Sequence, residues 1–311
     1  MRYAAVQGGG RVAYRVAGAH GPAFVYIGGS ASHQELLWEE PGFRRLYGGL
    51  GDIARVVTVD RRGTGLSDPL PTEASVQTHI DDVMAVLDAE GLTAASLSGT
   101  SDAARVAVAF AVLHPERVER LILFGTSASA IHMLEPARLV AFRRLIESAW
   151  GEGRMVQMWA PSRLGDARFQ AWAGRYERGC ASPGQALKMM ELASSIDVSD
   201  ELARVSVPTL VMHRRDDALT PVADGREVAA KIPGATFYEL RGTDTFTFSQ
   251  DPELIRDEVA TFLVGHRSGG RRSRVFVAVL FTDIVGSTRL AAQLGDERWT
   301  ELLSAWGRSR A

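Results

Sequence analysis

Short apolar segments alternate with helical segments along most of this 311-residue chain, and this alternation limits the fold more than any other feature. Segment 23–27 is short and continuously apolar, as a strand buried on both faces of a parallel sheet must be, and 55–59 is a second expected strand. Residues 78–90 instead repeat apolar side chains three and four positions apart, which indicates an amphipathic helix. The alternation predicts an α/β protein with a doubly wound, mostly parallel sheet.

The alternation stops near residue 127 and resumes at residue 209, and the segment between them shows helical periodicity only. A helical insertion in such a sheet predicts a lid over about 127–205. Glycines 8–10 separate two strand-like segments, as in a β-hairpin. The other expected strands are 3–7, 11–17, 95–97, 120–124, 209–213 and 236–240, and the other expected helices are 40–49, 103–113, 222–232 and 252–264.

Charge and cysteine content narrow the function. A formal net charge of −2 gives no overall attraction to nucleic acid or to anionic membranes. No apolar run reaches the roughly 18 residues of a membrane-spanning helix, and the N-terminus lacks the layout of a secretory signal. The single cysteine, Cys180, cannot form an internal disulfide, which suits a reducing compartment. We therefore expect a cytoplasmic protein with no nucleic-acid or membrane partner.

A serine stands in a tight turn between an apolar strand and an alanine-rich helix. The turn reads Gly99-Thr100-Ser101-Asp102-Ala103, with small residues two positions before and after the serine. Such a strand–turn–helix arrangement exposes a nucleophilic serine at the carboxyl edge of a sheet, where ligands bind. The helix N-terminus adds N–H donors and a positive dipole end for a developing oxyanion. The alternative is that Ser101 only caps the helix.

Over residues 1–265 the chain resembles α/β-hydrolase-fold proteins. The resemblance rests on the Gly28-Gly29 turn, on DRRGTGLSDP at 60–69, on the serine turn and on HPERVERLILFG at 114–125. It implies the chain order serine, acid, histidine. The implied acid is Asp217, with Asp216 beside it, and helix capping is the alternative for either.

The resemblance also places a histidine after the last strand, in the pattern Gly-x-x-His. That pattern falls on Gly242, so its fourth position is Thr245, and no histidine occurs between His213 and His266. Threonine has no pKa near 7 and cannot act as the general base. Loss of the base from such a triad lowers the rate by about four to six orders of magnitude. We therefore expect an incomplete triad of Ser101, Asp217 and Thr245.

The implied oxyanion hole uses the N–H groups of Ser30 and Asp102. The carboxylate of Asp102 opposes a developing anion unless its side chain points away. Among the histidines, His33 is the candidate for an unconventional base, and His213 is expected to orient the loop of the acid. The remaining ones are expected on the surface or in the lid: His20, His79, His114 and His132.

The inserted segment is rich in methionine and aromatic residues, which predicts an apolar pocket for a small molecule. The alternative is that they only pack the lid helices onto the body. These residues are Met133, Phe142, Trp150, Met155, Met158, Trp159, Phe169, Trp172, Tyr176, Met189 and Met190. We expect no cofactor for this domain.

The basic, glycine- and serine-containing segment 266–274 is the expected linker to residues 275–311. There, a strand-like run and FTDIVGST resemble the start of a class III adenylate/guanylate cyclase domain. The resemblance implies that Asp283 binds Mg²⁺ or Mn²⁺, helped by the carbonyl of Ile284. The remaining catalytic residues of that family would lie beyond Ala311. We expect residues 275–311 to form a short β-α stub without cyclase activity, in which Asp283 is a vestigial metal ligand. Mg²⁺ or Mn²⁺ would bind only in a full cyclase domain. A truncated reading frame is one explanation for the shortness of this segment.

Three functions follow. The first is a sensor-like module that binds a small apolar ligand without turnover, belonging to a nucleotide-cyclase fusion. The second is an active esterase-like serine hydrolase of small carboxylic esters that uses an unconventional base. The third is a non-hydrolytic enzyme, such as a lyase, that reuses the pocket. A homodimer is one open alternative, because cyclase sites form between two chains.

Overall fold

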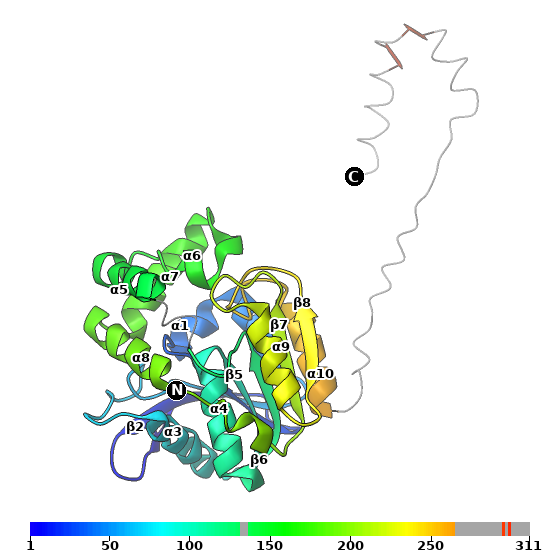
Figure 1. Ribbon diagram of the computed structural model, residues 1–311. Helices are drawn as coiled ribbons and strands as arrows, with labels where there is room; N and C mark the ends of the chain where they lie inside the picture. The colour runs from blue at the N-terminus through cyan, green and yellow to red at the C-terminus, as the bar shows by residue number, and fades with distance from the viewer. Residues whose placement is uncertain (131–135, 265–293, 296–297, 300–311) are drawn as a thin grey trace. The chain divides into compact units, whose positions relative to one another are not determined.

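A computed structural model describes residues 1–130, 136–264, 294–295 and 298–299 (Figure 1). The chain divides into two units, Met1–Gly269 and Gly270–Ala311. The expected linker at 266–274, the strand after it and Asp283 lie outside the described residues.

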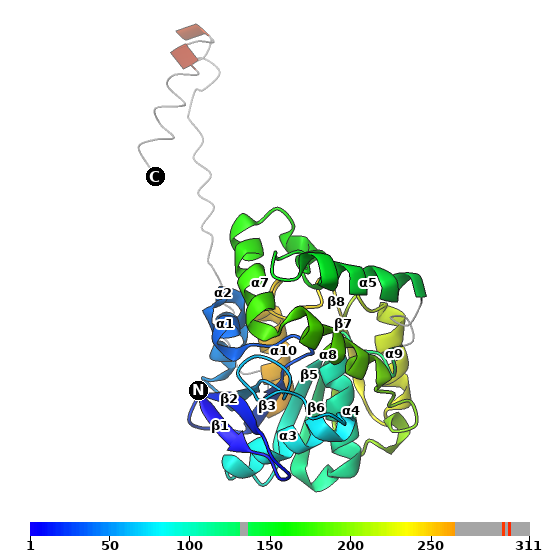
Figure 2. The ribbon, with the colours of Figure 1, turned by 90° about the vertical axis from the view of Figure 1, so that its left-hand side faces the viewer.

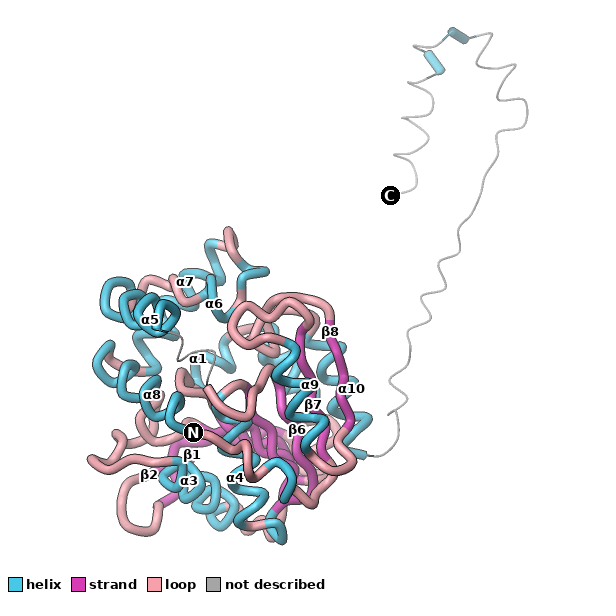
Figure 3. Tube along the Cα trace, in the orientation of Figure 1, coloured by secondary structure: helices cyan, strands magenta, loops and turns pink. Residues whose placement is uncertain are grey.

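The core of the fold is one eight-stranded sheet in the order β1-β2-β4-β3-β5-β6-β7-β8. Figure 3 shows its strands in magenta. Only the pairings of β1 with β2 and of β2 with β4 are antiparallel, and the other five are parallel. The strands are β1 (Arg2–Ala5), β2 (Arg11–Ala17), β3 (Ala23–Ile27), β4 (Arg55–Val59), β5 (Ala95–Thr100), β6 (Val118–Phe124), β7 (Thr209–Arg214) and β8 (Thr236–Leu240). The predicted doubly wound, mostly parallel sheet of an α/β-hydrolase fold is confirmed.

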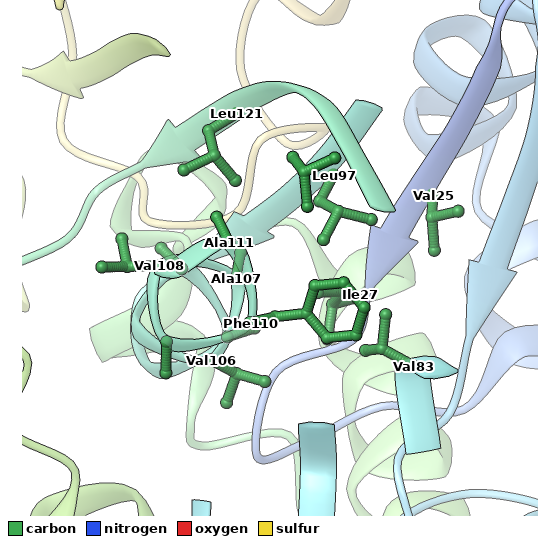
Figure 4. Close-up of a cluster of buried hydrophobic side chains, with 14 of the residues drawn as sticks. Val25, Ile27, Val83, Leu97, Val106, Ala107, Val108, Phe110, Ala111 and Leu121 are labelled. Atoms are coloured by element: carbon green, nitrogen blue, oxygen red, sulfur yellow. The ribbon is translucent and has the colours of Figure 1, made fainter. Parts of the chain in front are cut away.

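Two apolar clusters hold helices against opposite faces of this sheet. The first joins the strands to α3 (Val76–Ala89), α4 (Asp102–Leu113) and α9 (Val222–Lys231). Figure 4 shows part of it, with Phe110 among the strand side chains. The second joins the other face to α1 (Gln34–Glu39), α2 (Pro41–Phe43) and α10 (Pro252–Val264). Covering both faces explains why the central strands β3, β4, β5 and β7 are buried along nearly their whole length.

The predicted helix at 40–49 differs from the structure. Helix α1 begins six residues earlier, and its N-terminal cap is the imidazole of His33, which is an uncommon capping side chain. Pro41 cannot continue that helix, so a second helix starts there and runs into a π-helical turn at Arg44–Gly48. The atypical cap and the proline removed the usual sequence signals of one continuous helix.

Between β6 and β7, the described residues contain the lid helices α5 (Pro136–Ala149), α6 (Val156–Trp159), α7 (Ala167–Cys180) and α8 (Pro183–Ser195). Helices α5 and α7 lie beyond one end of the sheet in both views (Figures 1 and 2). The buried carboxylate of Glu177 organises the lid, because it accepts N–H groups of Gly151 (2.6 Å), Gly153 (3.0 Å) and Met155 (3.1 Å). Across the described residues, we find no helix with the length and apolarity to cross a membrane.

Candidate active site

The serine turn joins β5 to α4 in a strained backbone conformation. Ser101 has φ 55° and ψ −119°, a backbone conformation that residues other than glycine rarely adopt. Gly99 permits the close crossing of strand and helix, because a Cβ there would lie 2.4 Å from the carbonyl carbon of Ala103. The Ser101 N–H donates to the carbonyl of Phe124 on the neighbouring strand (3.0 Å). The strain and the tight crossing are those of a nucleophile turn rather than of an ordinary helix cap.

The strain gives a testable consequence. We expect Ser101→Gly to raise the free energy of unfolding by about 1 kcal/mol, because glycine adopts this φ freely and offsets part of the gain through its greater unfolded-state entropy. Ser101→Ala keeps the Cβ and should give no such gain. Urea denaturation of both variants checks this. Equal stability of the two variants would contradict the assignment of strain to the Cβ.

The acid lies in the loop after β7. Oδ1 of Asp217 accepts the N–H groups of Leu219 (2.8 Å) and Thr220 (3.0 Å). Burial raises the pKa of this carboxyl group, although those hydrogen bonds oppose the rise. Oδ2 is buried and has no partner among the described residues. Asp216, in contrast, is exposed.

Thr245 occupies the position where the family pattern places a histidine. It follows β8, is only 3% exposed, and its Oγ1 donates to Oδ1 of Asp217 (2.9 Å). Thr245 and Ser101 line the same cavity. Within the described residues, Ser101 Oγ itself makes no hydrogen bond. The structure therefore brings Ser101, Thr245 and Asp217 together at one site, with the Thr245 hydroxyl hydrogen-bonded to Asp217.

The two histidines singled out from the sequence have structural contacts. Nδ1 of His33 accepts the N–H of Leu36 at the start of α1 (3.4 Å), and His33 does not line the cavity. His213 is fully buried, and its Nε2 lies 3.0 Å from the carbonyl oxygen of Thr220 in the acid loop. His213 thus contacts that loop, as expected.

The prediction that His79 lies at the surface or in the lid is wrong. The residue is 1% exposed, and its Nδ1 lies 3.2 Å from Oδ2 of Asp82. Burial lowers the pKa of this imidazole. His20 is exposed and His114 is half-buried, whereas His132 lies outside the described residues. No described histidine lines the cavity at Ser101.

The carboxylate of Asp102 points into the region of the implied oxyanion hole. Its Oδ1 accepts the N–H of Ser30 (3.3 Å), and its Oδ2 accepts from Nη2 of the fully buried Arg61 (2.5 Å). Burial acts to raise the pKa of Asp102, but the charges of Arg61 and Arg105 and these hydrogen bonds hold it below its usual value. The Ser30 donor is therefore occupied by an anionic side chain of the protein itself.

The cavity beside Ser101 encloses about 870 Å³ of empty space when the open solvent at its mouth is included. Its aromatic and methionine lining consists of Tyr26, Phe142, Trp159, Tyr176, Met190, Phe246 and Phe248. The lid contributes four of these, as the sequence predicted for that segment, and the rings of Trp159 and Phe246 lie 5.3 Å apart across lid and body. Phe169 and Trp172 instead pack in the second apolar cluster, and Met133 lies outside the described residues.

The lining residues that sequence reasoning missed include Arg105, Phe246 and Phe248. Arg105 could have been found from the sequence, because it interrupts the apolar residues of α4. Arginine is rarely fully buried unless it is paired, so an arginine among buried positions indicates a specific role. The two phenylalanines follow Thr245 directly, but only the tertiary fold shows that their loop turns into the cavity.

The fold is that of the α/β-hydrolase proteins, and comparison with known families agrees. Residues 53–240 match the family described as “Serine aminopeptidase, S33”, and the chain belongs to that family. The match covers the serine turn and the acid loop.

The chain is similar in sequence to relatives whose names state an activity. It is 28% identical over 218 residues to the “Putative carbamate hydrolase RutD” of Caulobacter sp. (strain K31), covering 68% of this chain and 81% of the relative. It is 26% identical to the pyrrolizixenacetamide deacetylase of Xenorhabdus hominickii, covering 79% and 92%. Among solved structures, the enol-lactonase from Burkholderia xenovorans LB400 aligns with a TM-score of 0.72 at 23% identity, over 84% of this chain and 99% of that one. The last similarity concerns the fold alone.

Proposed function

We propose that this protein is an esterase-like serine hydrolase of small, mostly apolar carboxylic esters, with Ser101 as the nucleophile. The observation that carries the proposal is the strained Ser101, which opens into an apolar cavity beside a buried carboxylate. Relatives named as a carbamate hydrolase and a deacetylase support chemistry at an acyl carbon. The proposal needs no cofactor and no macromolecular partner.

In this proposal Ser101 Oγ attacks the ester carbonyl, and its proton passes through the Thr245 hydroxyl to Asp217. The proton returns by the same route to the leaving oxygen, which departs as the alcohol. Water then attacks the acyl-enzyme and gives a proton to Asp217 through Thr245, and that proton returns to Ser101 Oγ as the carboxylic acid is released. The Thr245 hydroxyl donates to Asp217 and keeps lone pairs to accept from Ser101, and burial makes the carboxylate more basic. A hydroxyl relays protons poorly compared with imidazole, so turnover is expected to be slow.

A second function, ligand binding without turnover, is favoured by one contact. Because Asp102 accepts the Ser30 N–H, an oxyanion would have to compete with a carboxylate for that donor. In this alternative the domain is a sensor-like module. Its coupling to a cyclase rests on the resemblance of residues 275–311, which fall almost wholly outside the described part of the chain.

Ester hydrolysis tests the proposal. We expect slow hydrolysis of p-nitrophenyl acetate and butyrate by the wild type, and none above background for Ser101→Ala. Labelling of Ser101 by a fluorophosphonate probe gives an independent check. Wild-type rates equal to those of Ser101→Ala would overturn the proposal and favour binding without turnover.

A further inference from the structure

Arg105 is a buried cation in the wall of the cavity. It lies on α4, about one helical turn beyond Ser101, and is only 5% exposed. Its Nη1 donates to Oγ of Ser127 (3.3 Å) and its Nη2 to the carbonyl of Ala193 (2.9 Å). Its Nε is buried and has no partner among the described residues.

Arg105 has no ion-pair partner among the described residues, because the nearby Asp102 is paired with Arg61. Burial lowers the pKa of the Arg105 guanidinium, and the charge of Arg61 adds to that effect. The charges of Asp102 and Asp197 oppose it. Buried charges in proteins are normally paired with an opposite charge. The wall of the cavity therefore contains a buried cation that has no ion-pair partner among the described residues.

The lining also contains hydroxyl side chains and the carboxylate of Asp102, which is paired with Arg61. Phe142, Trp159 and Met190 line the same cavity and offer aromatic and aliphatic surface. A ligand that satisfies both parts of this wall has an apolar body and one anionic group.

We propose that the cavity takes a carboxylate-bearing ligand, with the carboxylate on Arg105 and an apolar or aromatic body against the lid. The substrate that follows is an ester whose acyl part carries a second, free carboxylate, and this part of the inference rests on the proposed function. One helical turn separates the two groups of the protein, so a half-ester of a dicarboxylic acid reaches both. A guanidinium suits this role because it binds carboxylate through charge-assisted hydrogen bonds.

The competing explanation is that Arg105 only clamps the body to the segment around Ala193 through its two neutral acceptors. A clamp would affect charged and neutral ligands alike. An anion site discriminates between them, and binding can therefore separate the two roles.

The experiment compares 4-phenylbutyrate with the neutral 4-phenylbutyramide by isothermal titration calorimetry on the full chain. We expect the wild type to bind the acid at least about tenfold more tightly than the amide. Arg105→Gln should abolish this preference while leaving amide affinity within about twofold, and Arg105→Lys should retain part of it. Arg175→Gln, at an exposed arginine paired with Glu39, is the matched control and should behave as wild type.

Equal affinity of the wild type for acid and amide overturns the proposal, and so does binding of neither at millimolar concentration. This comparison needs no variant, so it stands even if Arg105→Gln fails to fold. Equal loss of both ligands in Arg105→Gln would support the clamp and overturn the anion site. The same titration in Ser101→Ala separates binding from turnover. An acid preference without any esterase activity would sink the proposed hydrolysis and leave the carboxylate site intact.

Discussion

Replacement of Thr245 by histidine is expected to raise kcat/KM for p-nitrophenyl butyrate by about a hundredfold. An imidazole at this position supplies a general base with a pKa near 7, which is worth about 10²–10⁴-fold in such enzymes. The acid needed to orient it is present, because Oδ2 of Asp217 is buried without a described partner and can accept the Nδ1–H of the ring. We expect the low end of the range, since the Ser30 donor is engaged by Asp102.

The matched control is Thr245→Val, which removes the hydroxyl on Asp217 and adds no base. It should lose the slow wild-type activity. Steady-state kinetics between pH 6 and 9 measure all three proteins, and the histidine variant should gain activity as pH rises through the pKa of its imidazole. A gain of similar size in Thr245→Val would show that the effect arises from cavity shape rather than from a new base.

Breaking the ion pair of Arg61 and Asp102 is expected to give the largest stability change in the site. Both side chains are buried, and removing one partner leaves the other charge without compensation. We expect Asp102→Asn to lower the free energy of unfolding by about 3–5 kcal/mol. The pair is also pH-sensitive. Because the folded pKa of Asp102 is depressed, its contribution is present above the unfolded value and is lost as pH falls through the folded pKa.

Guanidinium denaturation at pH 7 measures this loss. The double variant Arg61→Met with Asp102→Leu should recover much of it, because both charges are removed from the interior together. Disruption of the exposed pair by Arg175→Gln should cost less than about 1 kcal/mol. A loss below 1 kcal/mol in Asp102→Asn would mean that water or neighbouring groups already satisfy Arg61.

Elements with a simple period were predictable from sequence. Strands 11–17, 23–27, 55–59 and 236–240 have the predicted bounds, because short apolar runs between turn residues leave few alternatives. The serine turn and the acid loop were found because their chemistry depends on local order in the chain. Thr245 was located in the same way, by counting from the glycine after the last strand.

Features that depend on contacts between distant segments were not predictable. His79 appeared to be an ordinary surface residue until the fold buried it against Asp82. The direction of the Asp102 side chain depends on Arg61, which is 41 positions away. Arg105 is one of 35 basic residues in the sequence, and its burial beside the cavity, which only the structure shows, distinguishes it from the others.

Oδ1 of Asp217 accepts three hydrogen bonds, and these bear on which residues persist as related hydrolase-fold proteins change in sequence. Two of them are backbone N–H groups of the aspartate's own loop, and they shape that loop whether or not an imidazole is present. The third, the Thr245 hydroxyl, fills a hydrogen-bonding role that a histidine would otherwise take. Selection for a well-formed loop can thus preserve the aspartate after selection for catalysis has relaxed. The acid of a triad is accordingly a weak marker of activity, and the residue facing it is the more informative one to inspect.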